Sequence, residues 1–211
     1  MLGVSIDQDK IENEGARSQI VSIYRASFPN LERKNEDEFL SMANRNDYIF
    51  VTAKKIHIII GFSAIKILED NLFLLEYMAI EDSCRKFGIG GKLFEKSLDM
   101  IGRNSTLLLE VDSDDGSSGD NSQNRRRKKF YFSHGCGELK CLKYIMPLHG
   151  KKFIPMNIMI WRNIIPNAID KCEVRSWLNE IYTKVYGLEH GDKRIDVMLN
   201  DLDDNVFIVG G

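Results

Sequence analysis

Residues 73–98 read FLLEYMAIEDSCRKFGIGGKLFEKSL, and this segment is the most informative part of the chain. Positions 72–80 are almost entirely apolar, as expected for a central strand that is buried on both faces. Three glycines follow at Gly88, Gly90 and Gly91, and apolar residues then recur at helical spacing. The segment therefore predicts a strand, a glycine-rich turn and a helix.

The beginning of this helix is suited to binding an anion. The first backbone N–H groups of a helix have no partner within the helix, and they lie at the positive end of its dipole. Glycines allow a bulky anion to approach the backbone closely. Residues 85–92 are therefore predicted to bind phosphate groups.

Two common phosphate motifs do not fit this turn. A Walker loop requires Ser or Thr after its lysine, but Leu93 follows Lys92, and no glycine stands at the required distance before that lysine. A dinucleotide fingerprint requires a third glycine, where this chain has Leu93, and a place in the first strand–helix unit. Two or three strands precede the turn here, so both motifs are excluded.

The remaining pattern, [Gln/Arg]-x-x-Gly-x-[Gly/Ala], fits residues 85–90. It resembles the acyl-coenzyme-A site of the GCN5-related N-acetyltransferase (GNAT) superfamily, in a bacterial-type member. The resemblance implies that acetyl-CoA is a co-substrate, that the turn holds its pyrophosphate and that the preceding strand pairs with its pantetheine arm. The cofactor-binding residues implied are Met78, Ala79, Ile80, Arg85, Lys86, Phe87, Gly88, Ile89, Gly90, Gly91, Lys92, Asn124 and Tyr131.

A second motif strengthens the resemblance. GNAT members often carry N-x-x-A-x-x-[LF]-Y-x-x-x-G-F after the next strand, although Arg127 here replaces the alanine and Cys136 the final phenylalanine. In addition, residues 28–33 resemble the Phe-Pro…Glu-Arg segment of a bacterial subset. The matching positions of the second motif are Asn124, Phe130, Tyr131 and Gly135.

The resemblance also implies a reaction. An amine attacks the thioester carbonyl, an oxyanion forms and the CoA thiolate leaves. Tyr131 is the expected general acid that protonates the sulfur, with packing between its aromatic neighbours as the alternative role. A backbone N–H near Ala79 or Ile80 is expected to meet the oxyanion.

Glu76 is the candidate general base. We expect it to alternate with Leu74, Met78 and Ile80 on one strand face, where apolar neighbours would raise its pKa. A buried ion pair is the alternative role for Glu76. Its rivals as the base are Glu110 and Asp112 on the next strand, and a relayed water would make a base unnecessary.

The order of predicted elements indicates an α/β (α+β) fold. The GNAT resemblance implies a mixed, mostly antiparallel sheet of about six or seven strands, with a central parallel pair splayed at the acyl-CoA site. About four helices and a C-terminal helix would flank the sheet. The expected elements before the acyl-CoA turn are helices at 15–28 and 35–43 and strands at 48–53, 56–68 and 72–80. After it we expect a strand at 106–112, a loop to residue 124, a helix at 125–133, strands at 138–145 and 153–161, and a helix at 167–186. We expect an acetyltransferase domain at residues 1–165 and a C-terminal helix and tail at 166–211 packed on it.

Composition limits the partners. The 211 residues are 43% hydrophobic, and 29 Lys and Arg against 31 Asp and Glu give a net charge of −2, which provides no overall attraction to nucleic acid or an anionic membrane. The four cysteines lack C-x-x-C spacing and are expected to be reduced. No signal peptide or membrane span is expected from the pattern. We therefore expect a cytoplasmic monomer or homodimer.

Other charged groups have simpler interpretations. The basic run at 125–129 is expected to be a solvated helix face, although some of its side chains could meet the CoA ribose phosphate. The acidic loop at 112–124 lacks the glycine and glutamate of a calcium loop, and the histidines lack metal-ligand spacing. No metal is expected. The sequence thus predicts an acetyl-CoA-dependent N-acetyltransferase acting on a small-molecule or protein amine, or a catalytically weak acyl-CoA-binding or regulatory module of the same fold.

Overall fold

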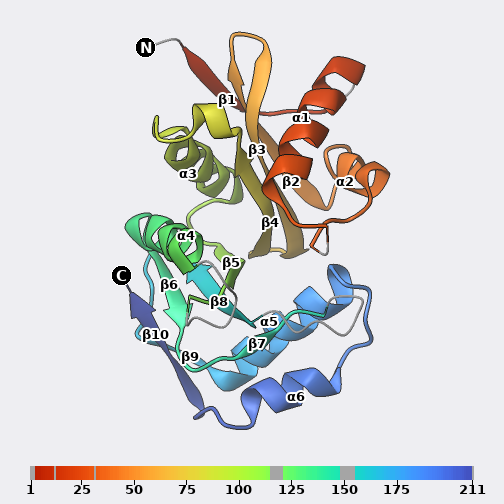
Figure 1. Ribbon diagram of the computed structural model, residues 1–211. Coiled ribbons are helices and arrows are strands. Elements are labelled where there is room, and N and C mark those ends of the chain that lie inside the picture. The colour runs from red at the N-terminus through yellow and green to blue at the C-terminus, as the bar shows by residue number, and fades with distance from the viewer. Residues whose placement is uncertain (1–2, 12, 31, 115–120, 148–154, 211) are drawn as a thin grey trace. The chain divides into compact units, whose positions relative to one another are not determined.

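The computed structural model describes residues 3–11, 13–30, 32–114, 121–147 and 155–210. Within these ranges the chain forms ten strands and six α-helices (Figure 1). The chain divides into two compact units, one made of Met1–Ile67 with Leu75–Arg103 and the other of Leu68–Leu74 with Asn104–Gly211. The predicted α/β class with a mixed, mostly antiparallel sheet is confirmed.

Four strands build the sheet of the first unit: β1 (Val4–Gln8), β2 (Tyr48–Lys55), β3 (Ile58–Glu69) and β4 (Leu72–Ile80). The first three are antiparallel neighbours, and the expected strands at 48–53 and 56–68 form the hairpin β2–β3. Ile56 makes its turn with a positive φ of 62°. The edge strand β1 was not expected, because its polar residues interrupt the apolar pattern.

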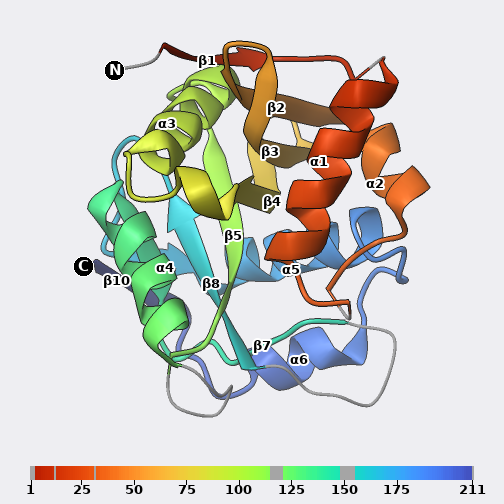
Figure 2. The same ribbon diagram turned by 45° about the horizontal axis from the view of Figure 1, so that its top comes forward.

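Three helices cover this sheet: α1 (Glu14–Ser27), α2 (Glu36–Met42) and α3 (Ile89–Ile101). Asn13 and Asn35 cap the first two with side-chain oxygens that accept backbone N–H groups. In Figures 1 and 2, α1 and α2 lie on one face of the sheet and α3 on the other. Tyr24 of α1 stacks on Phe39 of α2 with ring centroids 3.8 Å apart, so aromatic packing joins these two helices.

The second unit contains β5 (Thr106–Asp112), β6 (Cys136–Leu139), β7 (Tyr144–Ile145), β8 (Pro155–Trp161), β9 (Ala168–Asp170) and β10 (Asn205–Gly210). The first residues of β4 belong to this unit, and β4 and β5 form the one parallel pair among the described strands. The pairs β5–β8, β8–β6, β6–β10 and β10–β9 are antiparallel. The predicted parallel pair is thus confirmed.

The helices of the second unit are α4 (Asn121–Ser133), α5 (Lys171–Lys184) and α6 (Lys193–Leu199). α5 and α6 share one core cluster with the sheet, to which α5 contributes Trp177, Leu178, Ile181 and Tyr182. α4 packs instead against β5 and β6 (Figure 2). α4 begins four residues before the predicted start at residue 125.

The C-terminal part differs most from expectation. The predicted helix at 167–186 is the short strand β9 followed by α5, and the predicted strand at 138–145 is two strands separated by a turn at Cys141, whose φ is 65°. Residues 153 and 154 of the predicted strand at 153–161 lie outside the described residues. The strand β10 was not expected, because its partner β6 lies far away in the sequence. The division into domains at residue 165 stays a prediction.

Candidate functional site

The turn after β4 is folded by its own side chains. The N–H of Glu81 donates to the carbonyl oxygen of Ile60 at 2.8 Å, and the 3₁₀ turn η1 (Asp82–Cys84) follows. The guanidinium of Arg85 donates to the carbonyl oxygen of Ile80 at 3.0 Å and lies 2.6 Å from Oδ1 of Asp82. Arg85, which was predicted to bind the cofactor, therefore holds the turn in shape.

Left-handed backbone angles carry the chain from this turn into α3. Lys86 has a φ of 70° and Gly88 a φ of 74°, and Gly88 is the N-cap of α3 without a side-chain cap. The first helical bond runs from the N–H of Lys92 to the carbonyl oxygen of Gly88 at 3.3 Å. The N–H groups of the first three residues of α3, residues 89–91, thus have no partner in the helix.

The turn is open to solvent. Residues 85–88 are exposed, and the Phe87 side chain is 75% exposed. A Cβ added at Gly88 would meet nothing within 4 Å, so the positive φ, and not space, favours glycine at that position. The turn therefore presents uncapped helix N–H groups beside an exposed, glycine-containing backbone, which is suited to an anion.

The last residues of β4 pack on both faces of the sheet. Met78 and Ile80 belong to the apolar cluster of Ile89 and Leu93 on the α3 side, and Ala79 belongs to the α1 and α2 side. Ala79 and Ile80 are buried, and Met78 is half-buried.

The side chain of Glu76 is enclosed among polar groups of the first unit. The hydroxyl of Tyr48 donates to Oε2 at 2.7 Å, and Nζ of Lys34 lies 3.4 Å from Oε1. Only 5% of the side chain is exposed, and Oε1 has no hydrogen bond among the described residues. Burial raises the pKa of Glu76, and Lys34 and Tyr48 oppose this rise.

The carboxylate of Glu76 has different surroundings from the side chains of Met78 and Ile80. Met78 and Ile80 pack on the α3 side, whereas Glu76 reaches Lys34 in the connection between α1 and α2. The next residue, Tyr77, also reaches this connection, because its hydroxyl donates to the carbonyl oxygen of Glu32 at 3.0 Å. Two consecutive residues of β4 thus direct polar groups to the same segment.

Further charges surround Tyr48. Nζ of Lys66 and the guanidinium of Arg45 lie 4.8 and 4.9 Å from the centroid of the Tyr48 ring. Both cations also bind the carboxylate of Asp47 and hold its pKa well below the usual range. Lys34, Tyr48 and Lys66 were not expected near the site, although a lysine within the apolar strand at 56–68 was a signal for Lys66.

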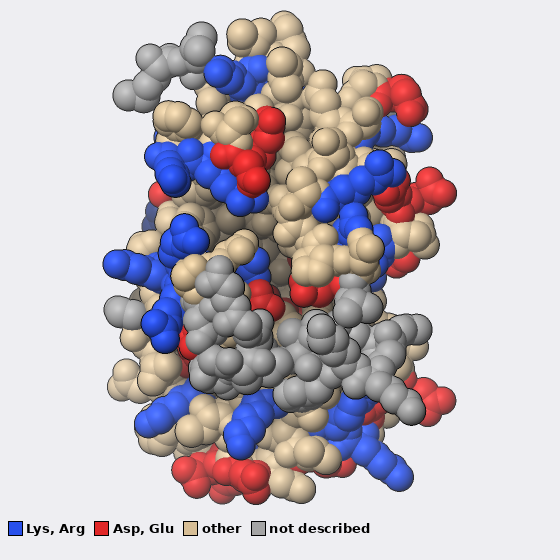
Figure 3. Space-filling model, viewed as in Figure 1, with Lys and Arg blue, Asp and Glu red and all other residues tan. Residues whose placement is uncertain are grey.

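The basic residues of α4 are partly neutralised. Arg127 pairs with Asp112, and Nζ of Lys128 lies 2.6 Å from Asp114 and 2.8 Å from Glu138. Nδ2 of Asn124 donates to the carbonyl oxygen of Ser113 at 3.0 Å, so Asn124 holds the chain that follows β5. Figure 3 shows Lys and Arg side chains gathered over α4. The exposed members of the basic run are Arg125, Arg126 and Lys129.

Tyr131 is buried in the second unit. Its ring meets that of Phe130 edge-on with centroids 5.2 Å apart. Burial raises the pKa of Tyr131 to about 12, and Arg127 opposes the rise. The phenol is therefore protonated at neutral pH.

The two rival bases are engaged by strong partners. Both carboxylate oxygens of Glu110 accept from the hydroxyl of Tyr186, at 3.0 and 2.9 Å, and Oε1 also accepts from Tyr144. Asp112 pairs with Arg127. Oε1 of Glu76, by contrast, is buried and accepts no hydrogen bond among the described residues.

The structure thus places the predicted residues in two groups. Glu76 and residues 78–92 belong to the first unit, and Asn124 and Tyr131 belong to the second, together with Glu110 and Asp112. In the described parts of the chain, no group of three or more His, Cys, Asp and Glu side chains is arranged to hold a metal. No described helix has the length and apolar character that crossing a membrane requires.

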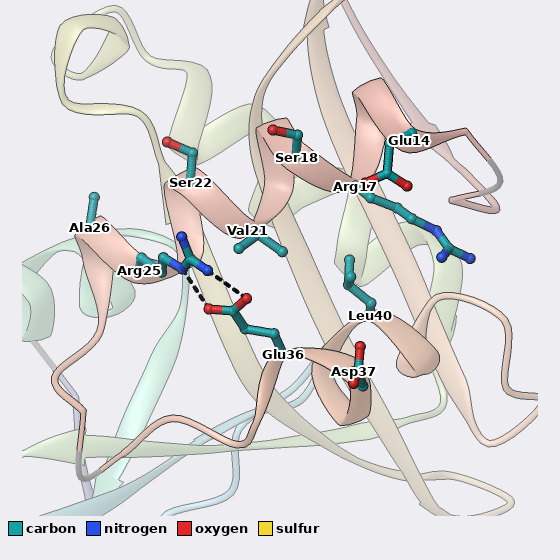
Figure 4. Close-up of a pocket in the computed structure, with 10 residues that line it drawn as sticks. All are labelled: Glu14, Arg17, Ser18, Val21, Ser22, Arg25, Ala26, Glu36, Asp37 and Leu40. Atoms are coloured by element: carbon teal, nitrogen blue, oxygen red, sulfur yellow. Dashed lines mark hydrogen bonds and ion pairs between the residues drawn. The ribbon is translucent and has the colours of Figure 1, made fainter.

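A groove of about 790 Å³ lies between α1 and α2, away from the predicted residues (Figure 4). Arg25 closes it through two bonds to Glu36, at 2.5 and 2.7 Å. Val21 and Leu40 contribute apolar surface, and the other residues that line the groove are polar or small. None of the candidate site residues lines it.

No family model and no curated protein matches this sequence. Solved structures do. A Bacteroides thetaiotaomicron protein assigned to the GNAT family of acetyltransferases has 19% identity and a TM-score of 0.72, over 88% of this chain and 99% of that chain. An aminoglycoside 6'-N-acetyltransferase complexed with coenzyme A has 20% identity and a TM-score of 0.58, over 77% and 98%.

The ribosomal-protein-S18-alanine N-acetyltransferase from Escherichia coli has 18% identity and a TM-score of 0.56, over 78% of this chain and 96% of that chain. The names of the aminoglycoside and ribosomal-protein enzymes give different acceptors, but all three structures share one architecture with this chain. The fold of this protein is therefore that of the GNAT acetyltransferases.

Proposed function

We propose that this protein transfers the acetyl group of acetyl-CoA to an amine by direct attack in a ternary complex. The observation that carries the proposal is the exposed turn at residues 85–88, which leads into the uncapped N-terminus of α3 at the end of β4. The GNAT fold supports it, and one similar structure is described as a complex with coenzyme A.

The cofactor would bind mainly through backbone groups. The N–H groups of residues 89–91 would donate to pyrophosphate oxygens, because a helix N-terminus is a favourable place for such an anion. Lys86 and Lys92 carry positive charge in the same segment. The backbone of residues 78–80 would pair with the pantetheine arm, as the GNAT resemblance implies.

The reaction needs one proton acceptor and one proton donor. The amine nitrogen forms a bond to the thioester carbon, an oxyanion forms, and the carbon–sulfur bond then breaks with its electron pair on sulfur. A backbone N–H near Ala79 or Ile80 would stabilise the oxyanion. The proton lost by the amine would pass to Oε1 of Glu76, directly or through one water.

Tyr131 would donate a hydrogen bond and then a proton to the departing sulfur. Its raised pKa of about 12 keeps the proton in place at neutral pH but makes the phenol a weak acid. Since general acids work best with a pKa near the working pH, its help would be modest. The acceptor would be a small-molecule or protein amine.

The test is calorimetry of CoA binding with two matched glycine variants. Gly88→Val and Gly102→Val introduce the same side chain at positive φ and in open space at opposite ends of α3. We expect Gly88→Val to weaken CoA binding by roughly tenfold or more, a loss of about 1.4 kcal/mol per tenfold, and Gly102→Val to leave it unchanged. Equal affinity in wild type and both variants would contradict the site.

A screen of amines with detection of the free CoA thiol separates the enzyme from a binding module. We expect thiol release that depends on both acetyl-CoA and an amine. CoA binding without turnover on any amine class would favour the catalytically weak acyl-CoA-binding or regulatory module.

A further inference from the structure

We propose that Lys34 is a positioning residue that keeps the carboxyl group of Glu76 ionised and ready to take the proton of the acceptor amine. The inference rests on the acetyltransferase function proposed above. It concerns the connection between α1 and α2, which the proposed chemistry does not otherwise use.

The two oxygens of Glu76 have different surroundings. Oε2 accepts from the hydroxyl of Tyr48 at 2.7 Å, so its position is fixed. Oε1 lies 3.4 Å from Nζ of Lys34 and has no hydrogen bond among the described residues. Lys34 thus stabilises charge on this oxygen through space while a lone pair stays available for a proton.

The backbone around Lys34 is held in place from three sides. The hydroxyl of Tyr24 donates to the carbonyl oxygen of Lys34 at 3.3 Å, and that of Tyr77 donates to the carbonyl oxygen of Glu32 at 3.0 Å. Asn35 caps α2 immediately afterwards, accepting from the N–H of Glu38 at 2.9 Å. The side chain of Lys34 is only 19% exposed, so its amino group stays close to Glu76.

The other cations near Glu76 are committed elsewhere. Lys66 and Arg45 each pair with the carboxylate of Asp47, and each lies over the Tyr48 ring. Nζ of Lys34 also lies 3.3 Å from the carboxylate of Glu38, whose side chain is 43% exposed. The groups that act on Glu76 are Lys34, Tyr48, Lys66, Arg45, Tyr77 and Tyr24.

Charge balance explains why this cation matters. A buried carboxyl group tends to hold its proton, and a protonated Glu76 cannot accept a proton from the amine. The positive charge of Lys34 favours the ionised form and is itself retained throughout, because the transferred proton moves from the amine to Oε1. Removing the charge should therefore leave Glu76 protonated up to a higher pH.

The test uses pH profiles of kcat/KM for wild type, Lys34→Met, Lys34→Arg and Lys54→Met. Lys54 is the matched control, because it is a lysine of the same unit that pairs with Asp9 at 2.8 Å. In Lys34→Met we expect the acidic limb to move to higher pH by about one to three units, the usual effect of a nearby opposite charge. Lys34→Arg should restore the wild-type limb, and Lys54→Met should not move it.

A second measurement does not depend on activity. The ¹³C NMR signal of the Glu76 carboxyl carbon is identified by its absence in Glu76→Gln. Its pH titration is then measured in wild type, Lys34→Met and Lys34→Gln. Two variants are used so that the misfolding of one does not decide the result. An unchanged Glu76 titration in the folded variants overturns the role of Lys34, even where wild type acetylates amines. A shifted titration in a protein that acetylates no amine contradicts the proposed function instead.

Discussion

Glu76 and Glu110 are each the fifth residue of an apolar strand, one in each unit, and their surroundings differ. Glu110 accepts hydrogen bonds on both oxygens from Tyr186 and on one from Tyr144. Glu76 accepts one hydrogen bond from Tyr48 and keeps Oε1 without any among the described residues.

The difference separates a structural carboxylate from a reactive one. A buried carboxylate whose oxygens are filled by hydroxyl donors is stabilised in its ionised form and has little tendency to take a proton. In a buried carboxylate with one oxygen that accepts no hydrogen bond and a neighbouring lysine, burial raises the pKa and the lysine opposes the rise. Sequence position alone does not separate them, since both are single acids in apolar strands.

The largest expected difference is in turnover. Glu76→Gln removes the proton acceptor, and we expect kcat to fall by about 10² to 10⁴-fold, the usual contribution of a general base. Glu110→Gln should change kcat by less than about fivefold. Steady-state kinetics at saturating acetyl-CoA measure both, and calorimetry of CoA binding shows whether the cofactor site is intact. Equal losses in the two variants would remove the distinction.

The second prediction is that Glu110→Gln destabilises the fold more than Glu76→Gln does, the reverse of their order in turnover. Glu110→Gln removes a charge that the hydroxyl groups of Tyr144 and Tyr186 stabilise, and we expect the free energy of unfolding to fall by about 1–3 kcal/mol. Glu76→Gln removes a charge whose burial is incompletely compensated, and Lys34 keeps its ion pair with Glu38. The free energy of unfolding should therefore change by no more than about 1 kcal/mol. Urea unfolding measures both. A larger loss in Glu76→Gln would show that its ion pair is structural.

The order of elements from residue 15 to residue 112 was predictable from the sequence because each signal there is local. The glycines at 88, 90 and 91 follow an apolar run, and the asparagines that cap α1 and α2 stand directly before amphipathic segments. The strands β9 and β10 are different, because β10 lies between β6 and β9 and its pairing depends on residues far away in the sequence.

The residues of the site were predictable to a lesser degree. The anion-binding turn follows from glycine chemistry, but the use of Arg85 to hold that turn depends on the carbonyl oxygen of Ile80, which no pattern indicates. Lys34 and Tyr48 reach Glu76 from other elements of the same unit. The contacts of Glu76 and Tyr77 with residues 32–34 likewise depend on tertiary structure that no local pattern indicates.

The smallest expected effect is a difference in how stability changes with pH. Burial raises the pKa of Glu76 above its ordinary value of 4.5, so the folded state binds more protons than the unfolded state between 4.5 and the raised pKa. The contribution of Glu76 to the stability of wild type therefore falls as the pH rises through this window, by at most about 1.4 kcal/mol per pH unit, and Glu76→Gln lacks this contribution. Relative to wild type, Glu76→Gln should become more stable with rising pH.

Glu36→Gln is the control with the opposite sign. Arg25 lowers the pKa of Glu36 in the folded state, so the stabilisation by this pair is present above the unfolded pKa and is lost as the pH falls. Relative to wild type, Glu36→Gln should become less stable with rising pH. Urea unfolding of the three proteins between about pH 4 and pH 8 measures both trends. Parallel curves for wild type and Glu76→Gln would mean that Glu76 has the same proton affinity folded and unfolded, and the contrast with Glu110 would then rest on kinetics alone.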